Sequence, residues 1–127
     1  MANPNIVGVT TILGNTSSKV ANTNYLHTQL VSNPASSGEI YKINTILASN
    51  QNTDNAVEVT VSLHSEDDLG GTANAIASSI SVPSQSTLII LDKSTSIYLT
   101  EDKSLGANVS SNNSVVITTS WEEISSS

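Results

Sequence analysis

Apolar and polar residues alternate along much of this chain with a period of two, a pattern typical of β-strands that bury one face. The clearest case is residues 57–64, where Val57, Val59, Val61 and Leu63 alternate with polar residues. This segment predicts a strand whose aliphatic side faces a core. Its other side, which includes His64, is expected to face water.

Residues 39–48 show the same alternation less cleanly. If the period of two holds throughout, one face of this strand carries Tyr41, Ile43, Thr45 and Leu47. Residues 15–18 (NTSS) predict a turn between the first two strands, because Asn and Ser bond readily to their own backbone.

The densest apolar run is residues 88–91 (LIIL), between Pro83 and Asp92. Four consecutive apolar residues bounded by turn-forming residues predict a strand buried on both faces. Shorter β-prone segments surround this run, and in the last of them Val115, Ile117, Thr119 and Trp121 share a face. They occupy residues 76–82, 97–99, 105–110 and 114–124.

Together the segments give about eight or nine short strands at a spacing typical of a sandwich. We therefore predict an all-β fold: a single-domain antiparallel β-sandwich of jelly-roll or immunoglobulin-like type over residues 1–127. Residues 1–9 are a candidate for an extended N-terminal arm, and residues 125–127 are expected to form a loose tail.

Charge excludes several classes of partner. Eleven acidic residues stand against four basic ones, a net charge of −7. Nucleic-acid binding needs clustered Lys and Arg, and so does binding to an anionic membrane surface, so neither partner is expected. The first residues lack a basic segment followed by an apolar one, so we expect no signal peptide and assembly in a cytoplasm.

Candidate chemistry is sparse. The chain has no Cys, and its two histidines, His27 and His64, lie in separate segments. We expect no enzyme activity, no catalytic residues, no metal and no cofactor. Residues 66–68 (EDD) beside Gly70 and Gly71 have two interpretations, a solvated acidic turn or a Ca²⁺ site.

Two regions are candidates for partner binding. Trp121 is either a core or rim aromatic of the last strand or an anchor for a neighbouring subunit, because Trp is frequent among residues that dominate interfaces. The first residues, including Asn3, Pro4, Ile6 and Val7, form either a plain first strand or an arm that reaches a neighbour.

Several segments resemble a family of small virion structural proteins from tailed phages, especially phages of marine cyanobacteria. The resemblance covers most of the chain, and its motifs are a pattern of strands and turns. The segments that carry it are residues 3–7 (NPNIV), 31–34 (VSNP), 42–44 (KIN), 82–93 (VPSQSTLIILDK), 97–99 (IYL), Glu101 and 120–124 (SWEEI).

The resemblance implies a virion component that binds other virion proteins. The function expected from it is a non-enzymatic head decoration or cement protein, oligomeric, that binds major capsid subunits. Two alternatives stay open: a protein of the neck, tail or fibre, and a carbohydrate-binding or Ca²⁺-dependent adhesion module.

Overall fold

A computed structural model describes residues 11–23 and 28–125 of the chain. Strands make up most of this part. In chain order the elements are β1 (Thr11–Val20), β2 (Thr28–Asn33), β3 (Glu39–Asn50), β4 (Val57–His64), β5 (Ala73–Val82), β6 (Thr87–Leu91), the 3₁₀ turn η2 (Lys93–Thr95), β7 (Ile97–Leu99), β8 (Lys103–Val109) and β9 (Val115–Ser125).

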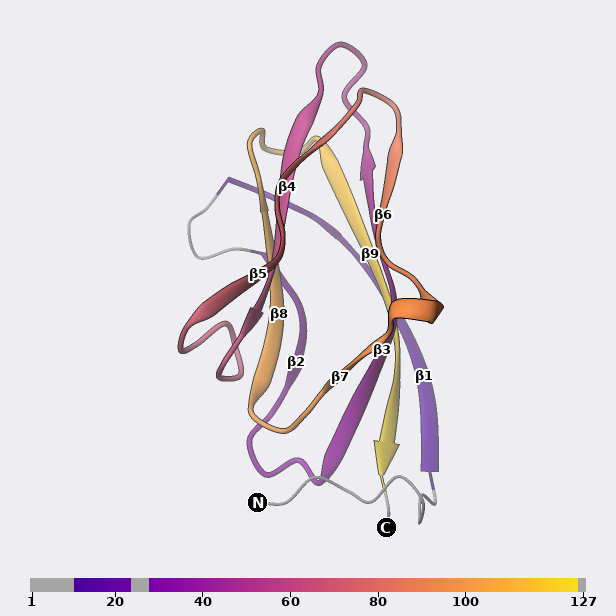
Figure 1. The fold of residues 1–127 in the computed structure, drawn as a ribbon, viewed down its shortest axis with the longest axis vertical. Helices are drawn as coiled ribbons and strands as arrows, with labels where there is room; N and C mark the ends of the chain where they lie inside the picture. The colour runs from indigo at the N-terminus through magenta and orange to yellow at the C-terminus, as the bar shows by residue number, and fades with distance from the viewer. Residues whose placement is uncertain (1–10, 24–27, 126–127) are drawn as a thin grey trace.

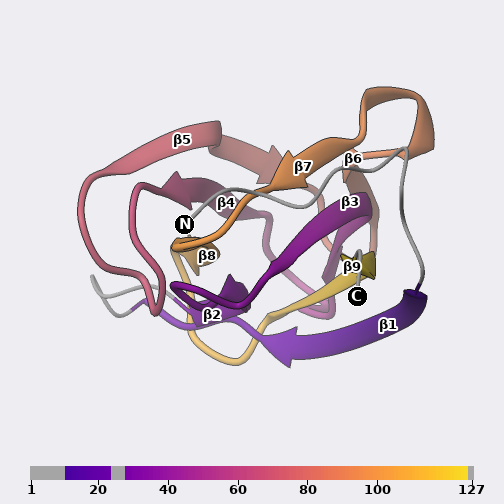
Figure 2. The same ribbon diagram turned by 90° about the horizontal axis from the view of Figure 1, so that it is seen from below.

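The strands form two antiparallel sheets that pack face to face (Figure 1). Sheet A has the order β1-β9-β3-β6, and β7 also pairs with β3. Sheet B has the order β2-β8-β4-β5. Viewed from below, β1 and β5 lie at opposite edges of the molecule (Figure 2). The predicted β-sandwich is confirmed.

The core between the sheets is aliphatic. In β4, Val57, Val59 and Val61 are buried, as the alternation predicts. The face predicted for β9 is also confirmed, because Val115, Ile117 and Thr119 are buried and Trp121 packs against the same cluster. Further fully buried side chains are Ile43, Ile46, Leu99 and Leu105. Interdigitated aliphatic side chains from both sheets hold the sandwich together.

The prediction that residues 88–91 are buried on both faces is wrong. They form β6, but β6 is an edge strand that pairs with β3, and Ile89 is 61% exposed. A run of apolar residues is as compatible with an apolar edge as with a central strand, so periodicity alone does not separate the two.

The face assigned to the second half of β3 is also wrong. The register with β9 shifts between Ile43 and Thr45, so Asn44 is an extra residue. A β-bulge of this kind reverses the facing of every later residue. Ile46 and Ala48 are therefore buried, whereas Thr45 and Leu47 lie on the outer side of sheet A.

The turn predicted at residues 15–18 is wrong as well. These residues lie inside β1, which pairs with β9 without a register shift from Thr11 to Val20. Their side chains bond across to β9 instead of to their own backbone. Ser18 Oγ lies 2.9 Å from Thr118 Oγ1, and Asn15 Nδ2 donates to Glu123 at 2.8 Å.

His64 does not face water. Its side chain is 5% exposed, because residues 65–72 fold back over the outer side of sheet B. Ser104 of β8 fastens this loop: its hydroxyl donates to the Glu66 carbonyl at 2.8 Å and accepts from the Leu69 amide at 2.9 Å.

The predicted arm, residues 1–9, lies outside the described residues, and with it Asn3, Pro4, Ile6 and Val7. His27 also lies outside them. Of the predicted tail, Ser125 is the last residue of β9, and residues 126–127 are outside the described part.

Candidate interaction surfaces

The outer side of sheet A is a surface built by five strands, and we call it the A face. Strand alternation and the register place side chains of β1, β9, β3, β6 and β7 on it. Four side chains are about half exposed or more: Ile12, Val20, Ile89 and Tyr98, at 53%, 52%, 61% and 47%. All four lie along the two edges of this face, two on β1 and two on β6 and β7, and exposed apolar side chains on one side of a sheet are a feature of interaction sites.

Hydroxyl groups fill the space between these apolar residues and bond to one another across strands. Thr16 Oγ1 donates to Ser120 Oγ at 3.3 Å, parallel to the contact between Ser18 and Thr118. Because these hydroxyls already have partners within the face, covering them costs less than burying unpaired hydroxyls. The A face is therefore polar in composition yet inexpensive to desolvate.

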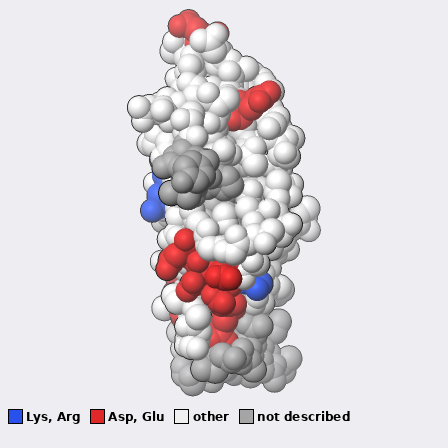
Figure 3. All heavy atoms as spheres, turned by 90° about the vertical axis from the view of Figure 1, so that its left-hand side faces the viewer, with Lys and Arg blue, Asp and Glu red and all other residues white. Residues whose placement is uncertain are grey.

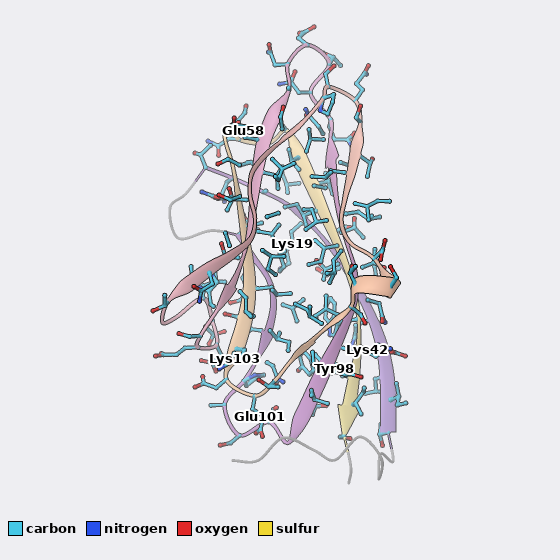
Figure 4. The ribbon with its side chains drawn as sticks, in the orientation of Figure 1. Lys19, Lys42, Glu58, Tyr98, Glu101 and Lys103 are labelled. Atoms are coloured by element: carbon cyan, nitrogen blue, oxygen red, sulfur yellow. The ribbon has the colours of Figure 1, made fainter. Side chains whose placement is uncertain are left out.

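Charge on the A face is confined to its lower part. Lys42 of β3 pairs in register with Glu122 of β9 and with Tyr98 of β7. Lys42 and Tyr98 both lie at the lower right of the molecule in Figure 4. Above them on this face, the residues that face one another across neighbouring strands, such as Thr118, Leu47 and Ile89, are all uncharged.

Trp121 belongs to the sandwich itself. It is half-buried, packs against the core, and donates its indole N–H to Glu123 Oε2 at 3.1 Å. The same oxygen accepts from Asn15 Nδ2 of β1. This position fits the interpretation as a rim aromatic, and partner binding through Trp121 stays a prediction.

Negative charge accumulates beside Trp121. Burial, reinforced by the nearby Glu123 carboxylate, raises the pKa of Glu39. Burial also raises the pKa of Tyr41 to about 12, with further contributions from Glu123 and Glu39. Glu123 faces Tyr41 of β3 on one side and Leu13 of β1 on the other, so no Lys is in register with these residues on either strand.

The acidic loop, residues 65–72, lies at the lower end of sheet B, where acidic side chains cluster (Figure 3). Its carboxylates connect chain segments. Asp67 Oδ2 accepts from the Ala35 amide at 3.1 Å, Asp68 Oδ1 accepts from Ser32 Oγ at 3.3 Å, and Asp102 Oδ1 accepts from the Asp67 amide at 3.2 Å. Within the described residues, no group of three or more His, Asp or Glu is placed to hold a metal ion.

The upper part of sheet B carries an open polar depression of about 200 Å³. A bulge in β5 shapes it: Ser79 has φ +49°, and its amide donates to Thr60 Oγ1 at 2.9 Å instead of to the sheet ladder. No aromatic side chain lines it. The lining residues are Glu58, Thr60, Ser79, Asn108, Val109 and Ser110.

Comparisons with known proteins add little to this geometry. No family model matches the sequence, and no curated protein matches it. Among solved structures, a chain from a crystal structure of the IBDV viral particle is similar, with 9% identity and a TM-score of 0.44. The match covers 90% of this chain and 31% of that one.

A search for helices that could cross a membrane finds none in the described part of the chain.

Sequence reasoning missed the A face because the bulge at Asn44 and the edge position of β6 were not apparent. One signal was present: between the core residues of β9 stand Val116, Thr118 and Ser120, uncharged where a solvated strand usually carries Lys or Glu.

Proposed function

We propose that this chain is a virion structural protein of a tailed phage, a non-enzymatic head decoration protein that binds major capsid subunits. The observation that carries the proposal is the A face. The surface combines exposed aliphatic side chains, mutually bonded hydroxyls and a charge-free upper part. It suits attachment to another folded surface, in which affinity comes from buried apolar area.

The size of the A face supports this role. β1, β9 and β3 are ten to twelve residues long, and β6 and β7 together line the other side of β3. With strands about 4.8 Å apart and a rise of about 3.3 Å per residue, this face spans roughly 600 Å². A standard protein–protein interface buries about 800 Å² on each partner. One copy thus offers somewhat less than a standard interface, and two adjacent copies offer more.

The sandwich supports the role in a second way. The carboxylates of residues 65–72 and 100–103 tie the loops at the lower end of sheet B to one another. A rigid domain loses little conformational entropy on binding, which favours attachment by a preformed surface.

The first experiment is to measure the copy number of this chain in purified particles, by quantitative mass spectrometry against the major capsid protein. Near-parity is the expected result. About six or twelve copies per particle would indicate a ring at the neck or tail, because closed rings hold few subunits. Absence from the particle would overturn the virion proposal and favour the adhesion module.

A matched pair of variants tests the A face itself. Ile89→Asp places a charge at the most exposed apolar residue of this face, and Asn108→Asp places the same charge on the opposite sheet. We expect Ile89→Asp to weaken binding to particles at least about tenfold and Asn108→Asp to leave it unchanged. Equal binding by both variants would exclude the A face as the attachment surface.

A further inference from the structure

Edge strands usually carry features that prevent pairing with other chains. Four edge strands of this sandwich, β2, β5, β6 and β7, do so. β2 has six residues and a register shift, and Pro34 follows it. β6 has five residues and a register shift, and β7 has three residues.

β5 carries the strongest protection. It is ten residues long, but its register with β4 shifts twice, and Ser79 has a positive φ within one of the shifts. Such bulges twist an edge and interrupt its row of donors and acceptors.

β1 lacks every one of these features. It is ten residues long, its register with β9 never shifts, and it has no Pro and only one charged residue, Lys19. Its side chains are exposed except Ser17. No other described residue pairs with the side of β1 that faces away from β9.

The register shows which backbone groups point to this open side. The Ala21 amide donates to the Val115 carbonyl at 2.9 Å, one step beyond the Val20–Val116 pair. In an antiparallel pair, hydrogen-bonded positions alternate, so the odd-numbered residues of β1 bond to β9. The even-numbered residues, from Ile12 to Val20, direct their N–H and C=O groups outward.

We propose that two copies of this chain associate through β1, whose open edges pair antiparallel about a two-fold axis at Thr16. This inference goes beyond the proposed function and does not depend on it. Pairing would join the two A sheets into one continuous sheet with about ten new backbone hydrogen bonds, two for each facing pair of even-numbered residues.

The two-fold axis restricts the register. Residues that face each other across the axis must lie on the same side of the joined sheet, so even-numbered residues face even-numbered ones. With Thr16 opposite Thr16, Ile12 faces Val20 of the other copy. These are two of the most exposed apolar residues of the chain, and the register covers both ends of the strand.

Charge complementarity supports a second copy as the occupant. In the same register Lys19 faces Leu13 of the other copy, and Leu13 is the neighbour of Glu123 in its own sheet. Lys19 and the other copy's Glu123 then lie two strands apart, about 10 Å between Cα atoms, within the combined reach of both side chains. Glu39 lies near Glu123, whose carboxylate adds to the effect of burial in raising the pKa of Glu39.

The test uses the full chain at increasing concentration, with molar mass measured by sedimentation equilibrium. We expect the mass to rise from that of a monomer to that of a dimer. Thr16→Pro blocks the edge and keeps every backbone bond to β9, losing only the exposed side-chain bond from Thr16 to Ser120. It should raise the dimer dissociation constant at least about tenfold with little change in Tm. A monomer mass throughout, or a Thr16→Pro variant that associates like the wild type, would overturn the proposal.

Two further variants keep the proposal testable if Thr16→Pro folds poorly. Lys19→Glu should weaken the dimer several-fold, and more at low salt than at high salt. Because the chain has no Cys, Thr16→Cys introduces a single thiol at the axis. A short bifunctional thiol reagent should then cross-link it far faster than Ser94→Cys, an exposed position on η2, which lies on the opposite side of the molecule from β1 in Figure 2. Equal rates would reject the pairing.

Discussion

The two long edge strands of this molecule, β1 and β5, have the same length but differ in the regularity of their backbone. Each has ten residues and pairs with one neighbour, β9 or β4. β1 keeps one register throughout, whereas β5 shifts twice around Ser79. The two edges are alike in exposure and length, so the pairing proposed for β1 depends on the regularity of its backbone, because an added strand needs an uninterrupted row of donors and acceptors.

The largest effect is expected at the anchor of β5. Asn50 of β3 is 1% exposed, and its amide donates to the carbonyl of Val82 at 2.9 Å and of Asn55 at 3.1 Å. Asn50→Ala leaves these carbonyls without a buried partner. We expect it to lower the free energy of unfolding by about 3 kcal/mol. Urea denaturation measures this change, and a loss below about 1 kcal/mol would show that Asn50 does not anchor β5.

A smaller effect distinguishes the two sides of β1. Ser17→Pro removes an N–H that bonds to β9, whereas Thr16→Pro removes one that faces the open edge. We expect Ser17→Pro to destabilise the monomer by about 2 kcal/mol and Thr16→Pro by less than about 1 kcal/mol. Thermal and urea unfolding at low concentration compare them. Equal losses would contradict the assignment of odd-numbered residues to the β9 ladder.

The bulge of β5 should respond to the side chain at Ser79, whose φ is +49°. Ser79→Val places a β-branched residue in the left-handed region and should cost about 1 kcal/mol. Ser79→Gly should be neutral or stabilise by about 0.5 kcal/mol. Urea unfolding of the two variants side by side checks the order, and the reverse order would mean that β5 has no strained residue there.

The smallest effect concerns charge near β1. The raised pKa of Glu39 means that its stabilising contribution is present below its ordinary pKa and is lost as the pH rises through the raised value. Glu39→Gln should therefore increase Tm slightly at pH 7 and leave it unchanged at pH 4. Tyr41, whose pKa is raised to about 12, should make stability fall between about pH 10 and pH 12.

Spectrophotometric titration of the tyrosines tests the same site. In Glu39→Gln, Tyr41 should ionise at a lower pH than in the wild type, because one nearby negative charge is gone. An unchanged titration would show that Glu39 does not contribute to the raised pKa of Tyr41.

Much of the fold could be predicted from the sequence. The β class, the strands of residues 57–64 and 114–124, and the inward facing of the β4 valines follow from alternation, which depends on near neighbours in the chain. The position of β6 at an edge could not be predicted, because an apolar run is compatible with either position. The A face was missed for the same reason, together with the bulge at Asn44.

The sequence by itself determined that this protein is an acidic, all-β domain with an aliphatic core, because composition and local periodicity are properties of the chain. Tertiary structure alone decided which strands became edges and which edge stayed regular. A strand becomes an edge through the pairing of segments far apart in the chain, as with β1 and β9. Its bulges depend on the register with that distant partner, which no local pattern specifies.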